Sequence, residues 1–306
     1  MNWSLFWDLT VSGVTLGSVY ALIALGYSMV YGILKLLNFA HGDVYMIGAF
    51  MGWFALHWLG GPVNPSATAA VVVVFMFVFA MVTCGGLGVV IERFAYRPLR
   101  NAPRIAPLIS ALGVSFFLQN SALLLFGANF RDYGTFDLIG AKTYNYKDIF
   151  LSVPQILTIV SAIGLMVGLT LLVARTKIGK AMRATSFDRE ATSMMGIDVD
   201  RVIASTFFIG SALAGAAGVM FGLVFGQIYH FMGFLAGLKG FTAAVIGGIG
   251  SIPGAMLGGL IIGLVESFAI GYVGGQWSDI VIFGLFILFM LFRPRGLLGS
   301  RAIQKV

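Results

Sequence analysis

Nine apolar segments, most of them about 20 residues long, follow one another along this chain with polar connections between them. About 20 apolar residues cross the hydrocarbon core of a bilayer as a helix. The segments are continuously apolar rather than alternating, which excludes a transmembrane β-barrel. We therefore expect an all-α, polytopic membrane bundle of eight or nine spans that forms a single domain over residues 1–306. The expected spans are 10–33, 41–59, 67–91, 106–126, 151–174, 202–228, 237–250, 255–273 and 279–292.

The seventh segment is shorter and richer in glycine than the others. Its sequence from residue 238 is LKGFTAAVIGGIG, which predicts a broken or re-entrant helix rather than an ordinary span. Such backbone is tolerated at membrane depth only where protein or a water-filled cavity covers it. The first segment has no preceding lysine or arginine and is too long for the core of a signal peptide, so we expect it to remain as an anchor.

Basic residues predict the orientation of the chain. Cytoplasmic loops of membrane proteins are enriched in lysine and arginine. Fourteen of the 19 basic residues lie in the connections that follow the third, fifth and last segments. If every segment, including the seventh, crosses the membrane once, these three connections lie on the same face. We expect that face to be cytoplasmic, with the N-terminus outside and the C-terminus in the cytoplasm. The residues are Arg93, Arg97, Arg100, Arg104, Arg175, Lys177, Lys180, Arg183, Arg189, Arg201, Arg293, Arg295, Arg301 and Lys305.

The composition excludes several other classes. A net charge of +7 could indicate a nucleic-acid partner, but these cations lie between membrane spans, where the positive-inside bias explains them. We therefore expect lipid and no nucleic acid around the chain. The single cysteine, Cys84, lies in an apolar segment and leaves no cysteine-based metal site. Histidines occur only at 41, 57 and 230, without paired carboxylates, so we expect no metal site and no enzyme.

Glycines recur at helical spacing in several segments. Small residues one turn apart allow membrane helices to approach closely. We favour close packing within one bundle, and the alternative is a face that meets a second membrane subunit or slides during transport. The pairs are Gly13 and Gly17, Gly218 with Gly222 and Gly226, Gly254 and Gly258, and Gly259 and Gly263.

The stretch from Arg175 to Arg201 is the most polar part of the chain. It carries ten charged residues between two spans, which predicts a contact with a soluble partner. We expect Ser186 to cap a short helix that Gly196 ends in a left-handed conformation. Methionines on this helix suit a partner surface that moves. The candidate contact residues are Asp188, Arg189, Glu190, Ala191, Met194, Met195, Gly196 and Ile197.

The same stretch contains a family motif. Glu190-Ala191-Thr192, followed after three residues by Gly196, resembles the E-A-A-x-x-x-G loop of bacterial ABC importer permeases. Thr192 departs from the second alanine of that pattern. In the family, the loop helix docks on a cytoplasmic ATPase and transmits its motion, which is what the resemblance implies for residues 175–201. The alternative is an ordinary amphipathic loop helix.

Other segments narrow the resemblance to branched-chain amino-acid permeases of the LivH type. It extends in order over nearly the whole chain and implies one membrane half of an importer in a bacterial inner membrane. The implied partners are a homologous LivM-type permease, two ATPase subunits and an extracytoplasmic binding protein. No G-x-x-x-x-G-K-[ST] loop occurs here, so ATP would bind to the partners and this chain needs no cofactor. The similar segments are 13–50, IERFAYRPLR (91–100), LISALGVSFFLQN (108–120), 241–267 and RPRGLLG (293–299).

The resemblance implies leucine, isoleucine or valine as substrate, because these are small zwitterions that suit an apolar path with few fixed charges. Relatives of the family carry other amino acids or urea, so an importer of urea, amides or other small polar solutes is the alternative. A channel or carrier that works without ATP is a further alternative, which the charged loop at 175–201 disfavours.

Two groups of polar residues are candidates for the translocation path. The first group is Asn38, His41, Gly42 and Asp43, which we expect near the inner face of the membrane. These residues either form the capped start of a helix or line a gate at a broken helix. For Asn38 we favour the cap. In the second group, Glu266 near the middle of a span needs a partner. Lys239 is the expected partner, with a structural pair favoured over a pathway role. We expect Gln119 to form a hydrogen bond between helices.

Overall fold

The computed structural model describes residues 3–60, 67–100, 102–103, 105–135, 143–146 and 149–299. Arg104, Arg301 and Lys305 of the basic connections therefore lie outside the described residues. The larger helices are α1 (Trp3–Leu34), α2 (His41–Trp58), α3 (Ala67–Ile91), α4 (Ile105–Phe126), α6 (Val153–Arg175), α7 (Lys177–Phe187), α9 (Val199–Phe225), α10 (Met232–Gly247), α11 (Ile252–Tyr272) and α12 (Ser278–Phe292). Shorter elements are η1 (Glu92–Tyr96), η2 (Arg97–Leu99), α8 (Arg189–Met194), η3 (Gly275–Trp277) and the strands β1 (Arg131–Asp132), β2 (Thr143–Tyr146), β3 (Ile149–Ser152) and β4 (Gln227–Ile228).

The predicted helical membrane bundle is confirmed. Seven helical segments among the described residues are long and apolar enough to cross a membrane, and they contain α1, α3, α4, α6, α9, α11 and α12. The two remaining expected segments are α2, with 18 residues, and α10, with 16. The boundaries differ from those expected: the first helix begins at Trp3 rather than at residue 10, and the glycine-rich helix covers Met232–Gly247 rather than 237–250.

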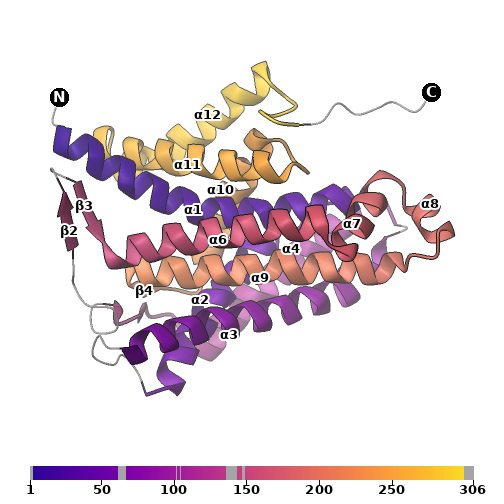
Figure 1. The fold of residues 1–306 in the computed structure, drawn as a ribbon, viewed down its shortest axis with the longest axis horizontal. Coiled ribbons are helices and arrows are strands. Elements are labelled where there is room, and N and C mark those ends of the chain that lie inside the picture. Colours follow the sequence, from indigo (N-terminus) through magenta and orange to yellow (C-terminus); the bar gives the residue numbers. More distant parts are fainter. Residues whose placement is uncertain are drawn as a thin grey trace.

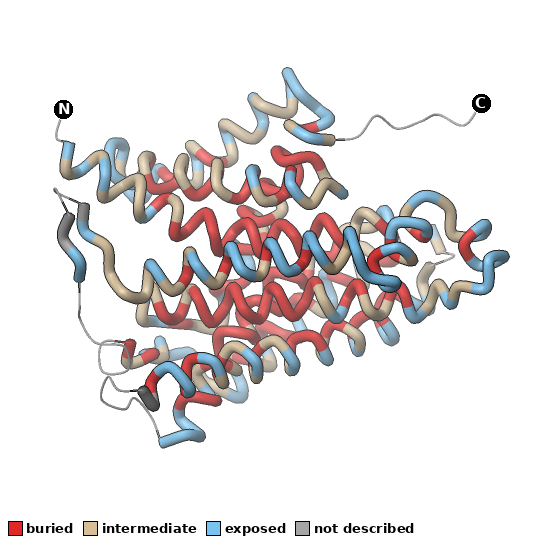
Figure 2. The backbone as a smooth tube through the Cα atoms, in the orientation of Figure 1, coloured by how far each residue is buried: buried red, intermediate tan, exposed pale blue. Residues whose placement is uncertain are grey.

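The bundle has a buried centre and an apolar periphery. In the most apolar stretches of α1 and α9, 72% and 78% of the residues are buried, against 11% in α12. Figure 2 shows this difference as a red centre with pale blue on the outer helices. Exposed valine, leucine, isoleucine and phenylalanine side chains cover α3, α4, α6 and α12. This outer surface suits the acyl chains of a bilayer, whereas the central helices are held by one another.

Glycine pairs bring the central helices together. A Cβ added to Gly263 on α11 would lie 2.2 Å from the Cα of Gly17 on α1, and one on Gly259 would lie 2.3 Å from the Cα of Ala21. Gly218 on α9 approaches the backbone of Tyr45 on α2 in the same way. These backbones are too close for any side chain, so the glycines at these crossings pack within the bundle, as favoured from their spacing.

The two ends of the bundle carry different elements (Figure 1). At one end, α7 and α8 project beyond the spans, the Arg189 guanidinium contacts the end of α1 at Ile33, and Arg100 contacts Asp200 at the start of α9. We call this the cationic end. At the other end, β1 pairs with β4 in antiparallel fashion, and the indole of Trp53 donates to the Asp132 carbonyl at 2.9 Å. We call this the opposite end.

The chain between α9 and α11 passes from the opposite end to the cationic end. Gly226 ends α9 in a left-handed conformation beside β4, whereas Gly250 lies against Gly32, near the end of α1. Helix α10, which makes up most of this passage, is about 24 Å long, shorter than the hydrocarbon core of about 30 Å. It begins deep in the bundle, where Gly233 and Gly237 approach the backbone of Gly42. The segment thus runs from inside the bundle to the cationic end as a short helix buried in protein.

The segment after α12 returns to the last turn of α10. The Leu297 and Leu298 amides donate to the carbonyls of Ile246 and Gly247 at 2.8 and 2.9 Å. These carbonyls belong to the last turn of α10, where a helix lacks its own donors. Gly296, with φ of 77°, allows the close approach to Gly248. The described C-terminal residues therefore cap α10 at the cationic end.

Candidate functional site

An exposed polar feature of the described structure is the α7–α8 projection at the cationic end. Asp188 caps α8 by accepting from the Ala191 amide at 3.1 Å. The expected cap at Ser186 is wrong, because Ser186 lies within α7 and its hydroxyl donates to the Arg183 carbonyl. An acidic cap suits the positive end of a helix dipole. Gly196 follows α8 with φ of 78°, the predicted left-handed conformation.

The expected contact residues divide into an outward and an inward group. Met194 and Met195 are 86% and 81% exposed, so their apolar side chains are largely uncovered. Glu190, Ala191 and Gly196 are exposed as well, whereas Asp188, Arg189 and Ile197 are half-buried.

Arg189 reaches back into the bundle. Its Nη2 donates to the Ile33 carbonyl at 2.6 Å and its Nε lies 3.3 Å from the same oxygen. Burial, reinforced by Arg100, lowers the pKa of Arg189. This residue therefore joins α8 to the end of α1 instead of pointing at a partner.

The cluster from Asn38 to Asp43 lies deep in the bundle, and its expected place near the inner face is wrong. A Cβ on Gly26 would lie 2.1 Å from His41 Nε2 and 3.0 Å from the Gly210 carbonyl. Gly210 is 11 residues beyond the start of α9 at Val199, a rise of about 16 Å. Residues 35–40 therefore turn back from the cationic end, and α2 begins at depth.

The side chains of this cluster bond to neighbouring helices. The Asp43 carboxylate accepts from Ser115 Oγ at 2.5 Å and from Gln119 Nε2 at 3.0 Å, both on α4. Gln119 therefore forms the expected contact between helices. Asn38 does not cap α2, because its side-chain oxygen lies 3.2 Å from the Tyr96 hydroxyl instead. The His41 ring packs edge-on against Tyr27, with centroids 4.8 Å apart.

This arrangement places a carboxylate at the junction of three helices. Asp43 is 1% exposed, its hydrogen bonds tie α2 to α4, and Gly42 contacts α10. No cation among the described residues pairs with it within 4 Å. A buried carboxylate depends on such donors, since burial removes its water. Asp43 thus holds a polar contact in the centre of an apolar bundle.

A second polar cluster joins α10, α11 and α12. Lys239 Nζ lies 2.7 Å from Glu266 Oε1 and also 2.7 Å from Asp279 Oδ1. Lys239 and Glu266 are 7% and 6% exposed, so the expected pair forms in a dry environment. Asp279 was not anticipated from the sequence and gives peripheral α12 a polar attachment to the centre.

A third cluster secures the cationic end. Arg100 pairs with Glu92, which is 3% exposed, and with Asp200 at the start of α9, and Arg97 pairs with Asp200 as well. Glu92 opens η1, a π-helical turn that continues α3. These pairs bind the connection after α3 to the first turn of α9.

Ser115 was not a candidate in the sequence analysis, although its spacing from Gln119 could have identified it. Ser115 and Gln119 are polar residues four apart on a largely apolar span, and such spacing places both on one face. The partner of that face, Asp43, is 72 residues away from Ser115, and spacing alone does not identify it. Among the described residues, no group of three or more histidine, cysteine, aspartate or glutamate side chains could hold a metal ion.

Comparisons with known proteins support a transport family. Residues 9–290 match the family model described as branched-chain amino acid transport system / permease component. The high-affinity branched-chain amino acid transport system permease protein BraD of Pseudomonas aeruginosa is 45% identical over 300 residues, covering 97% of this chain and 96% of that protein. Permease protein LivH of Escherichia coli K12 is 44% identical over 303 residues, covering 96% of each.

Two more distant matches were found, one in sequence and one in structure. Permease protein LivM of Escherichia coli K12 is 27% identical over 305 residues, covering 94% of this chain and 70% of that protein. Among solved structures, PsaBC from Streptococcus pneumoniae in complex with Fab matches with a TM-score of 0.50 at 12% identity, covering 97% of this chain and 92% of that chain. The second match shows a similar fold alone.

Proposed function

Because the chain belongs to the permease family of branched-chain amino acid transport systems, we propose that it forms one half of the membrane path of an ATP-driven importer for leucine, isoleucine and valine. The relatives are transport permeases, so the chain is a transport subunit and not an enzyme. The observation that carries the ATP-driven reading is the surface of α8. The six-residue helix α8 projects from the cationic end, and its last residue, Met194, and the following residue, Met195, are almost fully exposed methionines.

The partner at α8 is a cytoplasmic ATPase. Uncovered large apolar side chains on a polar projection mark a contact site, and methionine adapts to a surface that changes shape. The loop motif from Glu190 to Gly196 lies on the same projection. Arg189 then connects this helix to the end of α1, so a push on α8 is transmitted to a helix that runs the length of the bundle. ATP binds to this partner.

The other partners follow from the same assignment. The cationic end faces the cytoplasm of a bacterial cell by the positive-inside rule, which places the N-terminus outside. A binding protein delivers the amino acid to the opposite end, where β1 and β4 lie. A homologous LivM-type permease forms the second half of the path, because E. coli has both LivH and LivM among the relatives. Asn38, His41, Gly42, Asp43, Gln119, Lys239 and Glu266 remain candidates for the path or its gate.

The test removes the uncovered side chains of α8. The variant Met194→Ala with Met195→Ala keeps the capping contacts of Asp188, so α8 still forms. Truncating a hot-spot residue near the centre of an interface costs more than about 1 kcal/mol. If Met194 and Met195 are the apolar centre of the contact, we expect co-purification of the ATPase to fall at least about tenfold. Uptake of leucine by membrane vesicles with binding protein should fall in parallel, with insertion into the membrane unchanged.

Phe130→Ala is the matched control, since Phe130 is a 64% exposed apolar residue at the opposite end. It should leave ATPase binding intact. Normal uptake and normal stimulation of ATP hydrolysis in the α8 variant contradict the assignment of the docking surface. Uptake that continues without any ATPase subunit contradicts the importer itself and favours a channel or carrier.

A further inference from the structure

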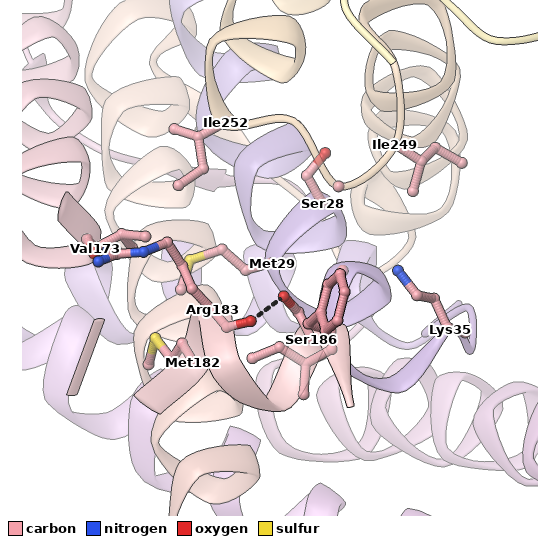
Figure 3. Close-up of a pocket in the computed structure, with 13 residues that line it drawn as sticks. Ser28, Met29, Lys35, Val173, Met182, Arg183, Ser186, Ile249 and Ile252 are labelled. Atoms are coloured by element: carbon pink, nitrogen blue, oxygen red, sulfur yellow. Dashed lines mark hydrogen bonds between the residues drawn. The ribbon is translucent and has the colours of Figure 1, made fainter. Parts of the chain in front are cut away.

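Helix α7 borders two hollows at the cationic end. The first lies between α1, α7 and the turn at 249–252, where Arg183 donates to the Val173 carbonyl and the Ser186 hydroxyl donates to the Arg183 carbonyl (Figure 3). These polar groups are therefore used within the chain. The second is a groove of about 370 Å³ between α3, α7 and α9, which lie beside one another in Figure 1. The proposed function assigns no role to this groove.

The groove is lined mainly by apolar side chains, all of them exposed or half-buried. Phe208 of α9 packs against Gly85 of α3, where an added Cβ would lie 2.7 Å from the ring. Ala204 and Ser205, one turn closer to the cationic end, are too small to fill the space between the two helices. Residues 210–220 of α9 are all buried, so the groove is where this central helix reaches the outer surface. The lining residues are Val89, Ile178, Ala204, Ser205, Phe208 and Ile209.

The groove lies at the depth of the outer acyl chains. Ser205 is six residues beyond the start of α9 at Val199, a rise of about 9 Å from the cationic end. Helix α3 has further exposed apolar residues beside the groove, such as Val82 and Val90, which suit a lipid environment. The groove is thus an apolar hollow that begins just below the membrane surface.

Basic residues follow where the apolar lining ends. Arg93, Lys177 and Arg201 lie on α7, α9 and the turn that continues α3, each one to four residues from a lining residue and on its cationic-end side. Four residues make about one helical turn, a rise of about 6 Å. Long basic side chains at such positions extend into the headgroup region. The mouth of the groove therefore carries positive charge from three separate elements.

Most of this charge is not neutralised within the described part of the chain. Arg93 and Lys177 are exposed and form no ion pair with a described residue. Arg201 pairs with Asp198, but the two side chains are 88% and 49% exposed, and such a surface pair is weak. None of the described residues that line the groove is acidic. The mouth therefore favours an anion.

We propose that this groove binds a phospholipid with an anionic headgroup, taken from the leaflet at the cationic end. An acyl chain lies against Val89 and Phe208, between α3 and α9. The headgroup phosphate lies beyond it, among Arg93, Lys177 and Arg201. Apolar lining followed by unpaired cations matches the order of tail and headgroup along a lipid, and basic pockets between membrane helices bind such headgroups. A soluble anion would use the cations alone and leave the apolar groove empty.

A lipid in the groove contacts three helices at once. One of them, α7, leads directly into α8. An occupied groove therefore holds α7 against α3 and α9 and restricts its motion. Only the consequence for transport rests on the proposed function: anionic lipid should then change how closely ATP hydrolysis follows uptake. The binding itself does not depend on that assignment.

The test uses the full assembly in detergent, purified with the subunits that accompany the chain. A trace of phosphatidylglycerol with a photoreactive diazirine on its acyl chain is added, and illumination should label peptides that contain residues 89 and 204–209. Unlabelled phosphatidylglycerol should compete about tenfold better than phosphatidylcholine, or more. Glycerol phosphate, which has the charge without the chain, should not compete at the same concentrations.

Two variants separate the charge from the groove. Arg93→Gln with Lys177→Gln should weaken competition by phosphatidylglycerol about tenfold or more and leave that by phosphatidylcholine unchanged. Arg293→Gln with Arg295→Gln is the matched control, because it removes two exposed cations at the same end that do not line the groove. Ala204→Phe fills the groove, keeps every cation and should lower labelling several-fold.

Hydrogen exchange gives an independent measurement. Phosphatidylglycerol should slow exchange of the amides in 177–182 more than phosphatidylcholine does. The Arg93→Gln, Lys177→Gln variant should lose this difference.

Several results overturn the inference. They are labelling confined to other peptides, equal competition by the two lipids, effective competition by glycerol phosphate, and lipid binding that the charge and groove variants leave unchanged. A benzoylphenylalanine at position 204 that crosslinks to a second protein subunit instead of to lipid overturns it in favour of a subunit contact. An assembly that binds phosphatidylglycerol in this groove but takes up no branched-chain amino acid supports the lipid site and contradicts the transport assignment alone.

Discussion

Replacing Lys239 by methionine removes the cation that lies between two carboxylates. Its ammonium is 2.7 Å from Glu266 and 2.7 Å from Asp279. The Asp279 side chain is 43% exposed and retains water, whereas the Glu266 side chain is 8% exposed. Most of the cost therefore falls on Glu266. Breaking a buried pair by removing one partner costs about 3–5 kcal/mol, which raises the unfolded population by roughly 10²–10⁴-fold.

The chain contains its own probe for this change. Cys84 is the single cysteine of the sequence and is 0% exposed on α3, so a thiol-reactive maleimide labels it only when the bundle opens. In the regime where opening is fast compared with labelling, the rate follows the open population. We expect Lys239→Met in detergent to label Cys84 about 10²-fold faster than wild type, or more, with a lower midpoint of thermal unfolding.

A double variant separates the structural reading of the pair from a pathway role. Adding Glu266→Gln to Lys239→Met removes the stranded charge and should restore most of the lost stability. If the pair is structural, this double variant also transports at a rate near that of wild type in the full assembly. A Lys239→Met protein that labels at the wild-type rate refutes the energetic argument. A stable double variant without uptake refutes the structural reading and supports the pathway role.

Two other predictions concern the centre of the bundle. Gly263→Ala places a methyl group 2.2 Å from the Cα of Gly17 and should lower the free energy of unfolding by about 1–3 kcal/mol through overpacking, which faster thiol labelling of Cys84 would detect. Gly284→Ala is the control and should be neutral, because its methyl group meets no atom within 4 Å. Equal effects of the two variants contradict the packing argument. Ser115→Ala removes one of the two donors to buried Asp43 and should cost about 1–3 kcal/mol in the same assay, so a variant as stable as wild type is evidence against that hydrogen bond.

The accuracy of the sequence reading depended on how local each feature is. Gly196 was assigned correctly because a left-handed residue after a short helix depends on its immediate neighbours. The cap was assigned to Ser186 instead of Asp188 because both are good capping residues two positions apart. Arg189 was grouped with partner-facing residues because the motif is contiguous, but its side chain binds Ile33, a contact across 156 positions.

The depth of the Asn38–Asp43 cluster illustrates the opposite case. A boundary between apolar segments normally lies at the membrane surface, so the sequence favoured the inner face for these residues. The structure instead turns residues 35–40 back into the bundle, where Ser115 and Gln119 supply donors for Asp43. Nothing in the spacing along the chain distinguishes these two arrangements, since both satisfy the polar groups.

By itself, the sequence determined that this protein is a helical membrane bundle of a transport family, because length, continuous hydropathy and contiguous motifs are properties of the chain alone. It also indicated that Glu266 needs a cation, since a lone carboxylate in a span is unfavourable. Only the tertiary structure decided that Lys239 is shared with Asp279 and that Asp43 lies at depth beside Ser115 and Gln119. The physical reason is that charge, burial and hydrogen bonding act over a few ångströms in space, between residues that can be far apart in sequence.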